Sequence, residues 1–349
     1  MTSSPIALVT GGSGWLGKRL VTALATGLPW PGAALAGGGW HVRCLVPAEE
    51  PAEELAKFGV EIVRGDIQSK DARQALLRES EGATLFHLAG VIHPPGRTAL
   101  FEAVNHRAGI ALIDEAKNIR RAVIMSSNSP IGCNPNPTHM FDENSPYNPY
   151  MGYGLSKMHL ELDLRDRIVG KKGPEITIIR APWFYGPGQP PRQTLFFQMI
   201  RDGKMPIFGN GKNRRSMAYT DSLALGLILA AQTPAAASET FWIADARPYP
   251  MGEIISTVAD VLKNDFGKNI RRPAPHLPGV ISDVARLVDK SLQTVGLYHQ
   301  KIHVLSEMNQ TIACNIAKAE RVLGYKPLVE LREGMRRSIE WCLQNGHTI

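Results

Sequence analysis

The chain has 349 residues, of which 44% are hydrophobic and 20% are charged, and it carries a net charge of +7. This ordinary globular composition excludes a disordered, collagenous or coiled-coil chain. No stretch approaches the roughly 18 consecutive apolar residues of a membrane span, and the basic residues are scattered in pairs, whereas a nucleic-acid footprint clusters them on one face. We therefore expect no membrane span and no nucleic-acid partner. The excess of cations suits a small-molecule substrate that is anionic.

The start of the chain enters a hydrophobic strand at Ile6 without the basic start, apolar run and cleavage site of a secretory signal. The four cysteines are far apart and include no CxxC pair, which excludes the usual cysteine zinc patterns and argues against a disulfide framework. We expect a cytoplasmic protein without a metal.

The first half of the chain alternates between strand and helix patterns. Two helix patterns stand out, at residues 15–26 and 103–117. Strands separated by helices predict a parallel sheet with right-handed crossovers, hence a doubly wound α/β fold of the Rossmann type. The predicted strands cover residues 6–10, 40–46, 60–64, 84–88, 122–126 and 176–180.

The pattern changes after Arg180. Loops rich in proline and glycine give way to mostly helical sequence over residues 252–345. We expect a dinucleotide-binding Rossmann domain over residues 1–182 and a smaller, mostly helical substrate lobe over 183–349, with the strand at 241–245 returning to the core sheet. The substrate would lie in the cleft between them. The sequence assigns no role to the proline- and glycine-rich loop at 28–39.

A glycine-rich turn joins the first strand to the first helix. Glycines at this turn permit positive φ and a close approach of the backbone to phosphate. The helix N-terminus adds free N–H groups and a partial positive charge, so this placement predicts a dinucleotide site. The residues expected to contact the cofactor here are Gly11, Ser13, Gly14, Trp15, Leu16 and Gly17.

The choice between NAD and NADP depends on the end of the second strand, where an acidic residue takes the ribose hydroxyls and an arginine favours a 2′-phosphate. Glu49 and Glu50 follow this strand, whereas Arg43 lies inside it and could point either way. This favours NAD, with NADP left open. Asp66, followed by Ile67, comes after the third strand and is placed to reach the adenine; its alternative role is a helix cap.

Tyr153 and Lys157 stand four residues apart on a predicted helix and therefore face the same side. A phenol with a pKa of about 10 is a poor base at neutral pH. A nearby ammonium and the positive nicotinamide ring stabilise the phenolate and lower this pKa. The pair predicts that Tyr153 exchanges the proton of a substrate hydroxyl while a hydride moves to or from the nicotinamide.

The strand predicted at 122–126 ends in a run of small polar residues. A hydroxyl at the carboxyl end of a strand lies where ligands bind in an open α/β sheet. We expect Ser127 to donate a hydrogen bond to the substrate oxygen, with Ser126 and Ser129 as alternatives, and Asn128 to orient the substrate.

Together these motifs resemble the extended short-chain dehydrogenase/reductase superfamily, in its NAD-dependent epimerase/dehydratase group. The resemblance implies a Rossmann domain, a nicotinamide cofactor lined also by Ala89 and Gly90, catalytic roles for Ser127, Tyr153 and Lys157, and a homodimer. It covers almost the whole chain, through Thr10-Gly-Gly-Ser-Gly-Trp-Leu-Gly17, Gly65-Asp66, His87-Leu-Ala-Gly90, Val104-Asn105, Tyr153-x-x-x-Lys157, Arg180-Ala-Pro-Trp-Phe-Tyr-Gly-Pro187 and Leu323-Gly-Tyr-Lys-Pro327.

Two branches of this superfamily compete. The region 203–245 and the C-terminal motif resemble the 3β-hydroxysteroid dehydrogenase and sterol-decarboxylase branch, yet Arg215 matches the position where sugar-nucleotide enzymes bind a diphosphate, which suits the guanidinium fork. Trp183 stands where those enzymes often carry asparagine. Asn128 and Ser129 replace the Asp-Glu pair of the sugar dehydratases, which argues against 4,6-dehydration. We expect Asn128, Trp183 and Arg215 to contact the substrate.

The sequence thus predicts an NAD(P)-dependent oxidoreductase or epimerase that acts at a secondary alcohol or ketone, with a nucleotide-linked sugar as the first substrate candidate. The alternative is a 3β-hydroxysteroid dehydrogenase-like enzyme for a sterol-like alcohol or β-keto lipid, in which an amphipathic helix at 280–295 lines an apolar pocket. A third hypothesis is a cofactor-sensing protein without catalysis. Such relatives lose the tyrosine or the lysine, whereas this chain retains Tyr153 and Lys157.

Overall fold

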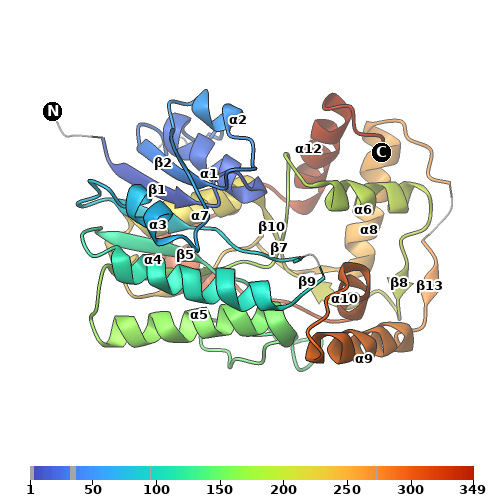
Figure 1. Ribbon diagram of the computed structural model, residues 1–349. Coiled ribbons are helices and arrows are strands. Elements are labelled where there is room, and N and C mark those ends of the chain that lie inside the picture. The colour runs from blue at the N-terminus through green and yellow to red at the C-terminus, as the bar shows by residue number, and fades with distance from the viewer. Residues whose placement is uncertain (1–3, 32–36, 95, 272–273) are drawn as a thin grey trace.

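A computed structural model describes residues 4–31, 37–94, 96–271 and 274–349. Seven strands form the central sheet in the order β11-β6-β5-β4-β1-β2-β3, and all neighbouring strands are parallel. The doubly wound fold is therefore confirmed (Figure 1). The strands are β1 (Ile6–Thr10), β2 (His41–Val46), β3 (Glu61–Arg64), β4 (Thr84–His87), β5 (Arg121–Met125), β6 (Glu175–Arg180) and β11 (Thr240–Trp242).

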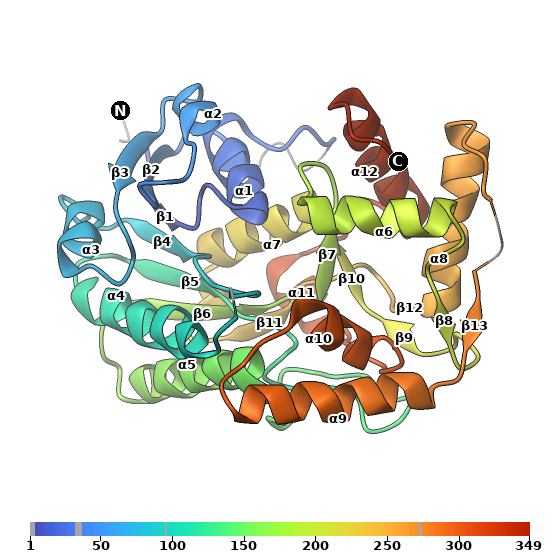
Figure 2. The ribbon, with the colours of Figure 1, turned by 45° about the vertical axis from the view of Figure 1, so that its right-hand side comes forward.

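Helices cover both faces of this sheet, as Figure 2 shows. One face packs against α1 (Trp15–Thr26) and α7 (Thr220–Gln232). The other packs against α3 (Lys70–Leu76), α4 (Gly109–Glu115) and α5 (Met151–Val169). Residues of β1, β4 and β5 are almost all buried because helices lie on both sides, which explains their mainly apolar sequence.

The helix predicted over residues 103–117 is two elements. A π-helix, η2 (Phe101–Ala108), runs directly into α4. The wider turns of a π-helix occur mostly as short insertions and are frequent at functional sites. Apolar periodicity alone does not distinguish such a segment from an α-helix.

A smaller lobe with its own buried core follows β6 and lies at the right of Figure 1. Three short strand pairs hold its loops, namely β7 (Trp183–Tyr185) with β10 (Met217–Tyr219), β9 (Arg214–Arg215) with β12 (Tyr249–Pro250), and β8 (Ile207–Phe208) with β13 (His276–Leu277). The remaining elements are α2 (Glu53–Ala56), α6 (Pro191–Arg201), η3 (Pro234–Ala236), α8 (Met251–Asp260), η4 (Val261–Asp265), α9 (Val280–Thr294), α10 (Gln300–Glu307), α11 (Ala317–Leu323) and α12 (Leu331–Gln344).

The chain crosses between the two lobes more than once. Although α7, β11 and α11 come late in the sequence, they pack into the core of the sheet, and β11 pairs with β6. The proposed division at residue 182 stays a prediction. Among the described helices, none combines the length and the apolar character needed to cross a membrane.

The loop at 28–39 lies partly outside the described residues, because positions 32–36 are not described. At its start, Trp30 Nε1 donates a 2.8 Å hydrogen bond to Asp221 on α7, and the guanidinium of Arg337 on α12 lies 4.2 Å from the centre of the Trp30 ring. This end of the loop therefore connects the sheet domain to the smaller lobe.

Candidate active site

Strands β1 and β4 lie side by side at the centre of the sheet, where the strand order reverses, and ligands bind outside the carboxyl ends of such strands. The loops after these two strands touch backbone to backbone. Gly11 has φ +73°, and a Cβ there would lie 2.8 Å from the nitrogen of Ala89. A Cβ at Gly17 would lie 1.9 Å from the carbonyl oxygen of Gly11. These glycines are required by the close packing of the turn itself.

The N-terminus of α1 fits a pyrophosphate. Gly14 is its N-cap, no side chain caps the helix, and its first turn holds no acidic residue. Its free N–H groups are therefore available to an anion. Trp15 turns away toward the smaller lobe, where Nε1 donates a 2.7 Å hydrogen bond to the carbonyl of Pro187, while Leu16 is buried.

The adenosine end of the crevice lies near the end of β2. The Ser13 hydroxyl donates to the carboxylate of Glu50 there. Arg43 is buried and binds Glu61 and the backbone after α3, so it is not free for a 2′-phosphate. Asp66 accepts a 2.8 Å hydrogen bond from the nitrogen of Gln68 in a local turn. Its alternative role as a helix cap is wrong, because Ser69 caps α3; Asp66 and the buried Ile67 beside it stay predicted adenine contacts.

Lys157 points from α5 into the protein beneath this crevice. Its side chain is buried, and Nζ donates a 3.0 Å hydrogen bond to the carbonyl of Met125 at the end of β5. A Cβ on Gly90 would lie 3.5 Å from Nζ, so the ammonium reaches the loop after β4. Burial lowers the pKa of Lys157 to about 8, and the negative charge of Glu161 opposes this shift.

Tyr153 lies one helical turn before Lys157, at the end of β5. Burial raises the pKa of Tyr153 to about 12, while a hydrogen bond with Ser127 and the positive charge of Arg192 act in the opposite direction. In the free protein the group is therefore a neutral phenol at pH 7. The expected lowering of this pKa by Lys157 is not found, because Ser127 and Arg192 are the groups that lower it and burial outweighs them.

The three serines at the end of β5 have different surroundings. Ser126 turns into the core and donates a 2.5 Å hydrogen bond to Glu161. Ser129 is further along the loop and lies 3.2 Å from Ser127, oxygen to oxygen. Ser127 is the serine of the three that lowers the pKa of Tyr153, which supports its choice over the two alternatives.

A buried network behind these residues was missed in the sequence. Glu161 forms a 2.6 Å ion pair with Arg180, and both side chains have no exposed surface. Glu161 also accepts a 2.9 Å hydrogen bond from the hydroxyl of Tyr147. The available signal was a glutamate beside Leu160, one helical turn after Lys157, on a helix face that is otherwise buried.

On the substrate side, a narrow pocket lies next to Tyr153 and is closed by the smaller lobe. Asn128 and Ser129 line it from the sheet domain, and His303 and Glu307 line it from α10. His303 Nδ1 lies 2.9 Å from the buried carboxylate of Asp289. Burial lowers the pKa of His303, but this hydrogen bond and nearby negative charges outweigh it, so the net pKa is raised. No local motif in the sequence could indicate these residues.

The three predicted substrate contacts are placed differently. Asn128 lines the pocket. Arg215 is buried on β9 and donates to the carbonyl of Glu307, a pocket residue, so it lies just behind the wall. Trp183 packs edge-to-face on Phe196, with ring centres 5.4 Å apart, within the core of the smaller lobe. Its contact with the substrate stays a prediction.

Comparisons with known proteins show which family and which fold this chain resembles. The profile of the NAD dependent epimerase/dehydratase family matches residues 7–244. An uncharacterized protein of Sinorhizobium fredii, y4nL, is 52% identical over 348 residues, which cover 99% of this chain and 97% of that protein. The Arabidopsis thaliana 3beta-hydroxysteroid-dehydrogenase/decarboxylase isoform 1 is 27% identical over 95% of this chain and 78% of its own length. The dTDP-glucose 4,6-dehydratase DesIV from Streptomyces venezuelae, solved with NAD and TYD bound, is 24% identical with a TM-score of 0.72, over 97% of each chain.

Proposed function

This chain belongs to the NAD-dependent epimerase/dehydratase family and is an NAD-dependent enzyme of the extended short-chain dehydrogenase/reductase type, and on that premise we propose that it oxidises or reduces a secondary alcohol or ketone. The observation that carries the proposal is the position of Tyr153, which lines the pocket, lies near enough to Ser127 for that hydroxyl to lower its pKa, and stands one turn from buried Lys157. These groups gather at the carboxyl edge of the sheet, next to the glycine turn that suits a pyrophosphate.

When bound, the nicotinamide cofactor would supply the hydride acceptor for an alcohol or, in its reduced form, the hydride donor for a ketone. Tyr153 then exchanges the proton of the substrate oxygen, and Ser127 donates a hydrogen bond that holds this oxygen near the phenol. Lys157, anchored on Met125, would bind the cofactor ribose and serve as the electrostatic partner of Tyr153 in the complex. Gly11, Gly14 and Gly17 hold the pyrophosphate, with Ser13, Trp15, Leu16, Ala89 and Gly90 completing the proposed cofactor contacts.

Replacement of Tyr153 by phenylalanine tests this assignment. Because the variant retains the ring and loses only the proton-transfer group, turnover should fall by roughly 10²–10⁴-fold while NAD binding persists. Tyr298→Phe is the matched control, since Tyr298 packs on the same Phe101 ring but its hydroxyl bonds His93. Undiminished turnover in Tyr153→Phe would show that another group carries the proton.

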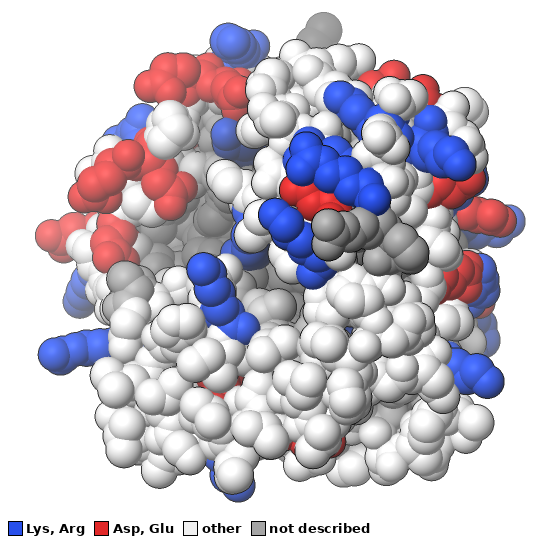
Figure 3. Space-filling view, turned by 90° about the vertical axis from the view of Figure 1, so that its right-hand side faces the viewer, with Lys and Arg blue, Asp and Glu red and all other residues white. Residues whose placement is uncertain are grey.

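For the substrate we favour a bulky apolar alcohol or β-keto acid. The outer face of α9 exposes a row of large apolar side chains, and the lower part of the face in Figure 3 carries few charged side chains. Contiguous apolar surface of this kind marks contact with a membrane or another apolar partner, so a lipid-like substrate would be drawn from there. The exposed side chains are Val280, Ile281, Val284, Leu287 and Val288.

A nucleotide-linked sugar is the second candidate, with oxidation, rotation and re-reduction as a route to epimerisation. The position of Arg215 behind the pocket favours it, as does the positive charge of Arg192 near Tyr153. The charge of Arg192 alone suits an anionic group on a substrate of either class. The predicted homodimer and cytoplasmic location stay predictions.

Titration with UDP and with a sterol β-keto acid separates the two candidates. If the substrate is lipid-like, the sterol compound binds, UDP does not, and Arg215→Ala leaves binding of the sterol compound within a few-fold. Binding of UDP that is lost in Arg215→Ala would establish the sugar nucleotide in its place.

A further inference from the structure

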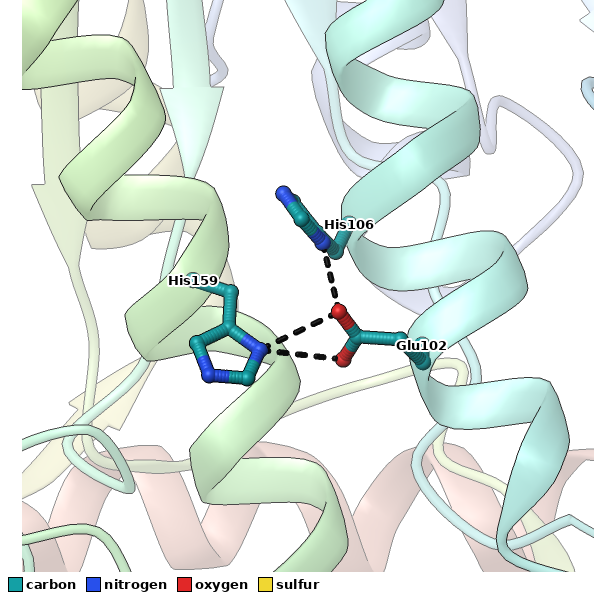
Figure 4. A group of neighbouring side chains, drawn as sticks. All are labelled: Glu102, His106 and His159. Atoms are coloured by element: carbon teal, nitrogen blue, oxygen red, sulfur yellow. Dashed lines mark hydrogen bonds and ion pairs between the residues drawn. The ribbon is translucent and has the colours of Figure 1, made fainter.

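Three metal-ligand groups meet on the outside of the helix pair formed by η2 and α5, as Figure 4 shows. Glu102 and His106 lie one turn apart on η2, and His159 faces them from α5. Glu102 Oε1 lies 2.6 Å from His106 Nδ1 and 3.1 Å from His159 Nδ1. All three donor atoms lie within 4.8 Å of one another.

We propose that this cluster binds a divalent transition metal, with Zn²⁺ as the ion its ligands suit best. Zinc takes imidazole nitrogen and carboxylate oxygen at about 2.0–2.2 Å in tetrahedral geometry, which places neighbouring donors about 3.3 Å apart. The distance from Glu102 Oε1 to His159 Nδ1 is close to this value. The contact between Glu102 and His106 needs to open by less than about 1 Å, and both side chains are only partly buried.

A fourth residue completes the arrangement from the far side of the His106 ring. His106 Nε2 lies 2.7 Å from Asp163 Oδ2 on α5. Metal-bound histidines nearly always donate their second ring N–H to a carboxylate or carbonyl, which orients the ring and raises its basicity. Asp163 therefore supplies the hydrogen bond that orients a metal-bound imidazole. Three side chains that met only by chance would not be expected to have such a carboxylate beside them.

The charges and the exposure also suit a cation. The two carboxylates, Glu102 and Asp163, balance a 2+ ion, and the Arg167 guanidinium is held by Asp114, at 2.7 Å. His159 and Asp163 are 42% and 43% exposed, so an ion can enter from solvent and keep a water in its fourth position. Imidazole and carboxylate donors favour zinc over magnesium or calcium.

The proposed role of the ion is to fasten η2 to α5 behind the active site. Asn105, which lies between the two ligands on η2, donates a 3.2 Å hydrogen bond to Ser156 of α5. Phe101, just before Glu102, packs on Tyr153 with ring centres 6.0 Å apart. Lys157 faces inward while His159 faces out, so the ion does not enter the reaction. Binding should raise the melting temperature.

The test is calorimetric titration of ZnCl₂ into the tag-free, EDTA-treated full chain. We expect one Zn²⁺ per chain, a loss of roughly 100-fold or more in affinity for His159→Ala, and about 10–100-fold for Asp163→Asn. His41→Ala is the matched control, since His41 also lies beside a glutamate, at 3.6 Å, but without a third ligand. Zn²⁺ should raise the melting temperature of the wild-type and His41→Ala proteins and leave that of His159→Ala unchanged.

Absence of Zn²⁺ binding to the wild-type chain would overturn the proposal. So would equal affinity in wild-type and His159→Ala proteins, because the ion would then be held elsewhere. Neither result depends on turnover, so they stand apart from the assignment of Tyr153.

Discussion

Lys157 Nζ on α5 donates a 3.0 Å hydrogen bond to the carbonyl oxygen of Met125, the last residue of β5. This bond ties the helix that carries Tyr153 to the strand whose extension carries Ser127. The proton-transfer groups therefore have their relative positions set by the core of the sheet, before any cofactor or substrate binds. Such preorganisation is what a proton transfer synchronised with hydride transfer requires.

Ketone reduction should slow above pH about 8. Burial lowers the pKa of Lys157 to this value, so its positive charge is present below about pH 8 and is lost above it. Tyr153, with a pKa of about 12, remains a phenol over this range and therefore adds no second inflection to the pH profile of kcat/KM. The measurement is kcat/KM for reduction between pH 6.5 and 9.5, and a flat profile would contradict the role of the lysine charge.

The lowered pKa of Lys157 also makes the free energy of unfolding depend on pH. The folded lysine releases its proton near pH 8, whereas an unfolded lysine does so near about 10.4. Between these values the unfolded chain binds more protons, so the contribution of Lys157 to stability rises with pH in this window.

Gly17→Ala should weaken NAD binding by at least about tenfold, since a 1.4 kcal/mol loss suffices for that factor. The new Cβ would lie 1.9 Å from the Gly11 carbonyl oxygen, which is backbone, so the phosphate-binding turn has to move. Gly252→Ala on α8 is the control, because its Cβ meets nothing closer than 3.5 Å. Titration of NADH by fluorescence compares the two, and wild-type affinity in Gly17→Ala would argue against a pyrophosphate at this turn.

The parts of the site that sequence predicted are those built from local patterns. The turn from Gly11 to Gly17 and the Tyr153–Lys157 spacing each specify a backbone geometry within one or two turns, and the strands of the sheet other than β3 are largely buried and mainly apolar. His303 enters the pocket from a late helix through packing between lobes, and no short-range pattern encodes such packing. The π-helix at η2 was missed because apolar periodicity does not resolve it.

Glu161→Gln should destabilise the fold by about 3–5 kcal/mol, since it leaves the fully buried guanidinium of Arg180 without its charge partner. Lys18→Ala removes the exposed pair with Glu54 and should change the unfolding free energy by less than about 1 kcal/mol. Urea denaturation measures both. A loss of less than about 1 kcal/mol in Glu161→Gln would mean that water or a rearranged side chain satisfies Arg180.

Asp289→Asn should destabilise the protein more at pH 6 than at pH 9. Asp289 is fully buried and lies 2.9 Å from His303 Nδ1, and this contact helps to raise the pKa of His303 despite the opposing effect of burial. A raised pKa contributes stability that is fully present below the unfolded value of about 6.5 and is lost as the pH rises through the folded value.

At pH 6 the Asp289→Asn variant should lose about 1.5–3 kcal/mol of unfolding free energy, the contribution of a hydrogen bond to a charged group. At pH 9 the loss should be smaller, because a larger fraction of His303 is neutral there than at pH 6. Urea denaturation at the two pH values, with His303 followed by NMR, provides the measurement, and equal losses would show that the imidazole is uncharged throughout.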